Sequence, residues 1–130
     1  MEISNSLILA ESTGAADPWP APLWAERRQV GCIRFSYVPT PARTPPRFEC
    51  VPRDGVDPGA VPHHTSLRFG DPAYGQLRHT THSAIRQGAD DESEMGATHE
   101  LYAPQREANL AIRLDEYLRF GLQAGWFHAT

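Results

Sequence analysis

The chain has 130 residues, of which 40% are hydrophobic, and its formal net charge is −4. This length allows one domain with a modest core, and the acidic balance excludes the basic surface that nucleic-acid binding requires. All twelve cationic residues are arginine, so Schiff-base chemistry on lysine and a Walker-type phosphate loop are excluded as well.

Membrane insertion and secretion find no support in the sequence. No run of 18 apolar residues is present, and such a run is needed to span a bilayer as a helix. The N-terminal apolar stretch has no basic flank and carries Glu2, unlike a signal peptide. We therefore expect a cytoplasmic protein without a membrane partner.

Residues 2–10 predict a strand, because Ile3, Leu7 and Leu9 alternate with mostly polar neighbours. Its mixture of small polar and aliphatic residues is typical of one rung of a stacked β-solenoid, so residues 1–12 are interpreted as a terminal rung. A lone strand is marginal, which implies that something pairs with it.

Residues 13–28 form a linker rich in proline and tryptophan. The stretch DPWPAPLW at residues 17–24 contains three prolines, which exclude a helix interior or a central strand. We expect an extended polyproline-like segment whose tryptophans, Trp19 and Trp24, lie over a hydrophobic surface.

An antiparallel hairpin is predicted for residues 29–51. Residues 28–38 alternate so that Ile33, Phe35 and Tyr37 share the face expected to be buried. Four prolines then impose a loop, and residues 47–51 form a short return strand. Cys32 and Cys50 are interpreted as buried thiols, although a cross-strand disulfide in an oxidising setting stays open.

The second half is predicted to be mainly helical after a loop at residues 52–65. Asp71 and Pro72 are suited to open a short helix over residues 73–78, and a second short turn covers residues 83–87. The strongest helix spans residues 104–120, with leucines at helical spacing. Gly121 is expected to end this helix, and residues 126–129 suggest a last strand.

The whole chain is thus interpreted as one small α+β domain. It joins the rung-like strand, the linker, the hairpin and the loop to a helical part at residues 66–130. No internal repeat is visible in the sequence.

Several stretches together resemble the C-terminal region of large, uncharacterised bacterial proteins. They are ERRQVGCIRFSYVP, HTSLRFGDPAYGQL and the segment from GADDESEMG to FGLQAG, which cover most of residues 26–125. In that family the region follows a long stretch of stacked β-rungs, and some members are associated with phage-tail-like contractile gene clusters. The resemblance implies a structural setting and no assigned activity.

Six histidines raise the possibility of a metal site. His79 and His82 are three residues apart, and an acidic residue or His99 is available to complete a site. No HExxH or clustered Cys/His motif is present, so a metal-dependent hydrolase with a His/acidic cluster is the alternative hypothesis.

Other catalytic patterns are absent from the sequence. The acidic run at residues 90–94 lacks the spacing of a calcium loop and is interpreted as a solvated loop whose carboxylates pair with Arg106 or Arg113. There is no GxSxG elbow and no GxGxxG motif. We therefore expect no catalytic residue and no cofactor.

Bulky aromatic residues are numerous for a chain rich in loops, and aromatic side chains are common interface anchors. Trp126 and Phe127 add to this set. The sequence predicts a structural or interaction element that caps or docks a β-rich neighbour, through a protein partner or self-association. The predicted contact residues are Trp19, Trp24, Phe35 and Tyr37.

Overall fold

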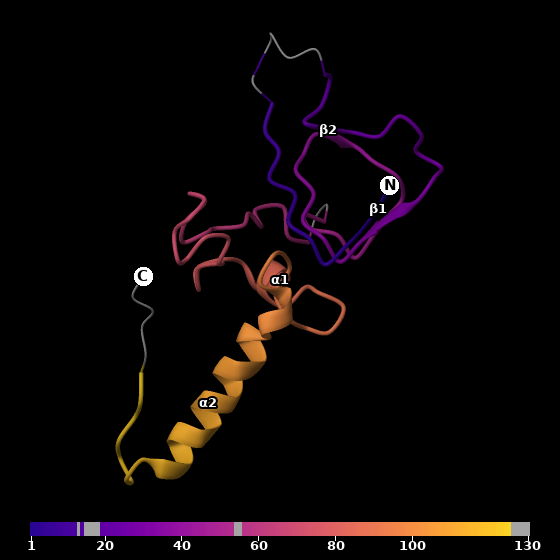
Figure 1. The fold of residues 1–130 in the computed structure, drawn as a ribbon. Coiled ribbons are helices and arrows are strands. Elements are labelled where there is room, and N and C mark those ends of the chain that lie inside the picture. Colours follow the sequence, from indigo (N-terminus) through magenta and orange to yellow (C-terminus); the bar gives the residue numbers. More distant parts are fainter. Residues whose placement is uncertain (13, 15–18, 54–55, 126–130) are drawn as a thin grey trace.

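The computed structural model describes residues 1–12, 14, 19–53 and 56–125 (Figure 1). Short strands occupy the N-terminal half and helices the C-terminal half, so the predicted mixed α+β class is confirmed. The strands are β1 (Glu2–Ser4), β2 (Leu23–Trp24), β3 (Cys32–Arg34), β4 (Ala42–Arg43) and β5 (Arg47–Phe48). The helices are α1 (Ser83–Arg86), a 3₁₀ turn η1 (His99–Leu101) and α2 (Ala103–Tyr117).

The strands are parallel, so the predicted antiparallel hairpin around Cys32 and Cys50 is wrong. One sheet has the order β1-β3-β5, with Ile3 beside Ile33 and Ile33 beside Arg47, and the other pairs β2 with β4. The proline-rich connection does not reverse the chain in a tight turn. It carries the chain round through β4, so that β5 enters the sheet in the same direction as β3.

Each strand of the larger sheet ends in the same bend. Asn5, Phe35 and Glu49 follow directly after β1, β3 and β5, and they have positive φ angles of 49°, 47° and 47°. Only glycine enters this region freely, and asparagine tolerates it better than most residues. Three stacked bends of one kind show that the chain segments around β1, β3 and β5 are equivalent, although no repeat was visible in the sequence. We call these segments the first, middle and third passages of the stack.

The residue after each bend makes the same local hydrogen bond. Ser6 Oγ, Ser36 Oγ and Cys50 Sγ each donate to the carbonyl oxygen two residues earlier, over 2.6, 2.6 and 3.5 Å. Ser36 and Cys50 are buried, so these bonds satisfy donors that would otherwise be costly inside the stack. Cys50 therefore takes the place of a third serine.

The bend also explains why the predicted buried face is wrong after Ile33. Ile33 is fully buried as expected, but the positive φ at Phe35 interrupts the alternation. Beyond it, Ser36 and Val38 point inward, whereas Tyr37 is only partly buried. Strand periodicity holds only where every residue keeps extended dihedral angles.

Both cysteines are free thiols. Cys32 lies beside Glu2 in the sheet, whereas Cys50 follows the bend after β5. The parallel arrangement thus places them at different levels along their strands. Cys50 is buried as predicted, whereas Cys32 is only partly buried, and the geometric basis for a cross-strand disulfide is removed.

The predicted solenoid rung at residues 1–12 is not confirmed, because the described residues form no solenoid. β1 covers three residues only, and an isolated parallel bridge between Leu7 and Tyr37 extends its pairing. After the bridge from Tyr37 to Val51 the chain continues into loops and helices rather than further stacked strands.

Two hydrophobic clusters hold these parts together. Inside the stack, Ile33, Val38 and Cys50 pack with partly buried neighbours from β2 and β4. The second cluster contains Val51, Ala60, Ile85 and Met95, and Leu7 and Tyr37 pack against it. Burial of Ile85 therefore attaches α1 to the outside of the parallel stack.

The helix predicted over residues 73–78 is wrong. The segment forms turns and two isolated bridges, Ser66 to Tyr74 and His64 to Leu77. Gly75 has a φ of 74°, which a right-handed helix does not allow. The Asp71 carboxylate accepts a hydrogen bond from Ser66 Oγ at 2.6 Å rather than capping a helix.

Helix α2 confirms the strongest helical prediction and projects away from the rest of the molecule (Figure 1). It begins near Pro104 and ends at Tyr117, where Leu118 adopts an extended conformation, so it stops before the predicted residue 120. None of its residues is buried. The last predicted strand, residues 126–129, lies outside the described residues.

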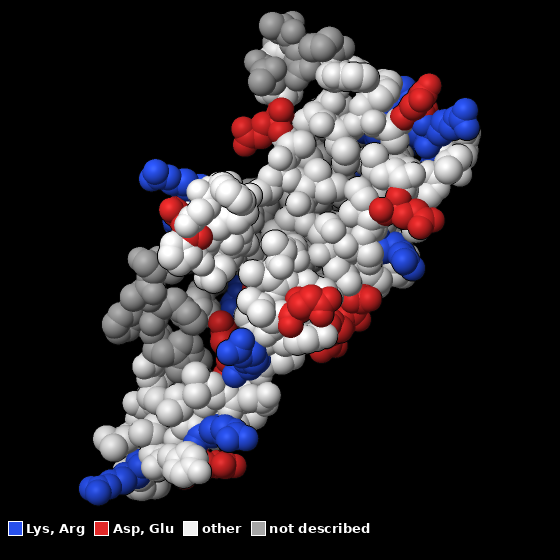
Figure 2. Space-filling view, viewed as in Figure 1, with Lys and Arg blue, Asp and Glu red and all other residues white. Residues whose placement is uncertain are grey.

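One face of the molecule is mixed in charge. Figure 2 shows acidic and basic side chains interspersed over the visible face, with no extended area of one sign. Among the described residues, no helix has the length and apolar character needed to cross a bilayer.

Candidate docking surfaces

The outer edge of β1 carries no strand from the described part of the chain. β3 pairs with β1 on one side and with β5 on the other, whereas β1 pairs with β3 alone. Asn5 N–H donates to Arg34 O, so the preceding residue, Ser4, directs its N–H to the opposite side of the strand. β1 therefore presents hydrogen-bonding groups for a further strand.

The apolar interior is also incomplete at this end of the stack. Ile33 and Val38 in the middle passage are 0% exposed. Their equivalents in the first passage, Ile3 and Ile8, remain partly exposed. The difference follows from position, since the middle passage has a neighbour on each side and the first has only one.

A groove of about 750 Å³ runs beside the stack. Its walls are mostly apolar and come from three segments: residues 8–12, residues 37–41 with Pro22, and residues 61–67. The apolar lining residues are Ile8, Leu9, Ala10, Pro22, Tyr37, Pro39, Pro41, Val61, Pro62 and Leu67. Glu11 is the one formally charged side chain among the described lining residues. A concave, mostly apolar surface of this size is typical of binding sites.

His64 adds a polar group to the wall of the groove. Burial, and secondarily the adjacent His63, lower the pKa of His64 below its ordinary value of 6.5. The imidazole is therefore neutral at physiological pH, which suits an apolar wall.

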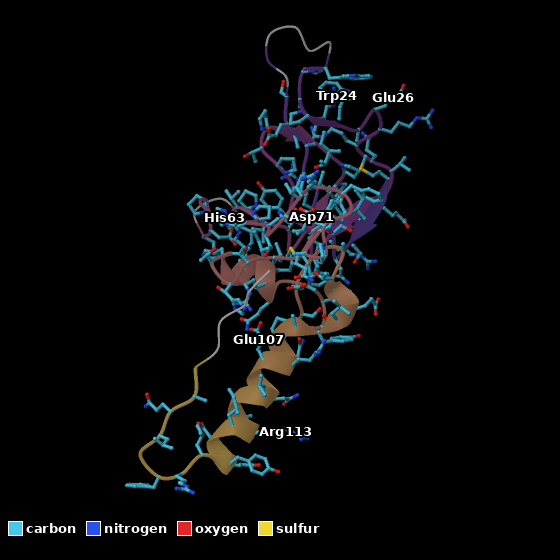
Figure 3. The ribbon with its side chains drawn as sticks, turned by 60° about the vertical axis from the view of Figure 1, so that its left-hand side comes forward. Trp24, Glu26, His63, Asp71, Glu107 and Arg113 are labelled. Atoms are coloured by element: carbon cyan, nitrogen blue, oxygen red, sulfur yellow. The ribbon has the colours of Figure 1, made fainter. Side chains whose placement is uncertain are left out.

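The four predicted contact residues lie in different surroundings. Tyr37 lines the groove, and Phe35 makes an edge-to-face contact with Phe48, with ring centroids 5.6 Å apart. The Arg43 guanidinium lies 4.3 Å from the centroid of the Trp24 ring, and Trp19 is 63% exposed. Figure 3 places Trp24 at the end of the molecule opposite α2, where Glu107 and Arg113 are labelled.

A polar clasp joins β1 to the loop that precedes η1. The side-chain amide of Asn5 donates to Asp90 Oδ1 at 2.7 Å, and its Oδ1 accepts from Asp90 N–H at 3.2 Å. Asn5 Nδ2 also lies 3.4 Å from His99 Nε2. Gly96 N–H donates to Asn5 O at 2.8 Å, so both the side chain and the backbone of Asn5 hold this loop.

The other side of the His99 ring completes the clasp. Nδ1 lies 2.6 Å from Ser93 Oγ, which is also 2.6 Å from Asp91 Oδ1. A proton on Nδ1 is consistent with these contacts, because Ser93 then donates to Asp91 and Nε2 accepts from Asn5. The serine hydroxyl also lowers the pKa of Asp91.

Ser93, His99 and Asp91 do not form a catalytic triad. In a triad the histidine stands between the serine and the carboxylate, whereas here the serine stands between the other two. Ser93 is moreover fully buried, so no substrate reaches its hydroxyl.

The three histidines of the alternative metal hypothesis have separate partners. His82 Nδ1 accepts from Ala84 N–H at the start of α1, and His79 Nε2 lies 3.4 Å from Glu107. His99 instead groups with Asp90 and Asp91, with one potential ligand atom from each within 4.8 Å of the others. Because these three side chains already serve the clasp, their proximity needs no ion to explain it.

A second polar network lies between α1 and α2. Glu94 is buried and accepts a hydrogen bond from Thr98 Oγ1. Burial raises its pKa, and the Thr98 hydrogen bond and the nearby Arg86 oppose that rise. Arg86 also bonds Glu107 at 2.8 Å. The expected partners of the acidic run were Arg106 and Arg113, whereas Glu94 of that run bonds Thr98 and lies in the field of Arg86.

The comparisons with known proteins return nothing for this chain. No protein-family model, curated protein or solved structure matches it. The functional conclusion therefore depends on the geometry of the molecule.

Proposed function

We propose that this chain is a docking element that caps a β-rich protein neighbour, which pairs with the open edge of β1. The observation that carries the proposal is the difference in side-chain burial between the middle passage and the first passage of the stack. Ile33 and Val38 are fully buried, whereas Ile3 and Ile8 at equivalent levels are not. A strand added beside β1 removes that difference.

Strand addition supplies both affinity and specificity at such an edge. Main-chain hydrogen bonds to an exposed strand provide affinity, and the pockets for alternate side chains select the sequence. Burying one isoleucine side chain completely contributes roughly 1.5–3 kcal/mol, and part of this remains available at Ile3 and Ile8. Three short parallel strands offer little further surface, so a neighbour with its own hydrophobic core fits this role best.

The rest of the molecule supports a structural role over catalysis. Ser93 and Glu94 are buried, and their contacts with His99 and Thr98 hold loops against the stack and beside α2. The resemblance to C-terminal regions that follow stacked β-rungs gives a setting for the proposal, within a larger assembly such as a phage-tail-like particle.

NMR titration of the ¹⁵N-labelled chain tests the proposal, because it detects weak binding residue by residue. The probe is a synthetic peptide with the sequence GCIRFSYV, residues 31–38, which already pairs with the inner side of β1. We expect saturable shifts centred on the amides of β1.

Two variants make the titration specific. Ser4→Pro removes the outward N–H while leaving the Asn5 to Arg34 bond, and it should abolish the shifts. Ser4→Ala keeps the N–H and should titrate as the wild type. Shifts that stay away from β1, or that persist in Ser4→Pro, would refute the proposal.

A further inference from the structure

The C-terminal end of α2 exposes large apolar side chains. Tyr117 is 85% exposed, Phe120 is fully exposed and Leu122 is 60% exposed. These residues lie at the far end of a helix that leaves the body of the molecule (Figure 1). Water contact over this much apolar surface at one site is unusual for a chain that stays alone.

The exposed apolar surface is not confined to one side of the helix. Leu110 and Leu114 fall on one face at helical spacing, whereas Ile112, which is 60% exposed, falls on the opposite face. A helix that is apolar on more than one side is normally enclosed rather than laid on a flat surface. The end of α2 therefore fits a concave receptor.

The groove beside the stack has the matching properties. It is concave, holds about 750 Å³ and is lined mostly by apolar side chains. Its one formally charged lining residue is Glu11, and the one charged residue within residues 117–122 is Arg119. The two surfaces thus match in polarity and carry opposite charges.

The groove and the helix end of the same chain lie apart. Figure 3 places His63, the neighbour of the groove residue His64, on the body of the molecule, while Arg113 lies well along α2 and outside that body. Figure 1 shows α2 running on from there away from the stack. The complementary surfaces consequently meet between two copies more readily than within one.

We propose that residues 117–122 of one chain insert into the groove of a second copy, and that the second copy reciprocates. An aromatic side chain offers about 150–250 Å², so residues 117–122 bring roughly 500 Å² of apolar surface to each insertion. Two insertions bury on the order of 1,000 Å² of the inserted segments, which lies at the lower limit for a specific interface. The groove includes Ile8, which the docking proposed at β1 also covers, whereas residues 117–122 take no part in that docking.

Size-exclusion chromatography with light scattering on the full chain measures the assembly. We expect a mass twice the 14.5 kDa of one chain, with dissociation on dilution. Phe120→Ser combined with Tyr117→Ser should give monomers, and so should Leu67→Asp in the groove. All three positions are exposed, so circular dichroism should show an unchanged fold. Val30→Ser is the matched control, because Val30 is an exposed apolar residue outside both the groove and α2, and it should leave the dimer intact.

Mixing experiments separate reciprocal insertion from other modes of association. An equimolar mixture of the helix variant with the groove variant should form a weakened heterodimer, because one insertion remains intact. A monomeric wild type overturns the proposal. Loss of the dimer in the helix variant but not in Leu67→Asp also overturns it, since α2 would then pair with another α2.

Discussion

Replacement of Asn5 by alanine tests the clasp that joins the stack to the C-terminal half. The side chain makes two hydrogen bonds with Asp90, at 2.7 and 3.2 Å, and approaches His99 at 3.4 Å. Each net hydrogen bond contributes about 0.5–1.5 kcal/mol, and exposure of Asp90 keeps the bond to its carboxylate in that range. Alanine at a φ of 49° costs about 1–2 kcal/mol more. We therefore expect Asn5→Ala to lower the free energy of unfolding by about 3–4 kcal/mol.

Asn5→Gly separates the two contributions. Glycine adopts the positive φ without penalty but lacks the amide, so this variant should lose only about 2 kcal/mol. Urea denaturation followed by circular dichroism measures both values. Asp90→Ala combined with each variant then shows whether the effects couple. A loss below about 0.5 kcal/mol for Asn5→Ala, or equal losses for alanine and glycine, would refute the reasoning about the clasp or the bend respectively.

Three further outcomes follow from the described contacts. Cys50→Ser should change the unfolding midpoint little, because serine already fills the equivalent places, whereas Ser36→Val should destabilise the chain by about 1–3 kcal/mol by overfilling the stack. Glu94 has a raised pKa in the folded state, so its protonated form contributes to the stability of that state. This contribution is complete below pH 4.5 and is lost as the pH rises through the folded pKa. Glu94→Gln should therefore exceed the wild type in thermal stability at neutral pH, and the difference should vanish in acid. His64 has a lowered pKa, so the stability that its neutral form contributes is present above pH 6.5 and is lost as the pH falls through the folded pKa. His64→Asn should therefore reduce the pH dependence of the free energy of unfolding over this range.

Local signals in the sequence were sufficient for α1 and α2. Pro104 and the leucines at helical spacing predict α2 to within a few residues, because capping and amphipathicity depend on neighbours along the chain. The short turn near α1 is predicted for the same reason. The helix over residues 73–78 failed because Gly75 could be read as a weak helical residue, whereas the structure uses its positive φ.

The direction of strand pairing depends on distant parts of the chain, and the antiparallel prediction was wrong. A signal nevertheless exists: EISNSLI at residues 2–8 and CIRFSYV at residues 32–38 align position by position, with isoleucine second and serine fifth. This alignment is hard to recognise because phenylalanine and glutamate, at Phe35 and Glu49, do not suggest a bend with positive φ. The clasp was equally hidden, because Asn5 and His99 are 94 positions apart.

The two thiols of this chain are expected to differ in reactivity. Cys50 sits inside the stack, where burial raises its pKa and keeps it in the unreactive protonated form, while Cys32 is partly exposed at the sheet surface. Alkylating reagents and mild oxidants should thus modify Cys32 first, which gives a natural position for a fluorescent label. The rate at which Cys50 is modified then reports how often the stacked passages open, and mass spectrometry measures this rate without an engineered probe.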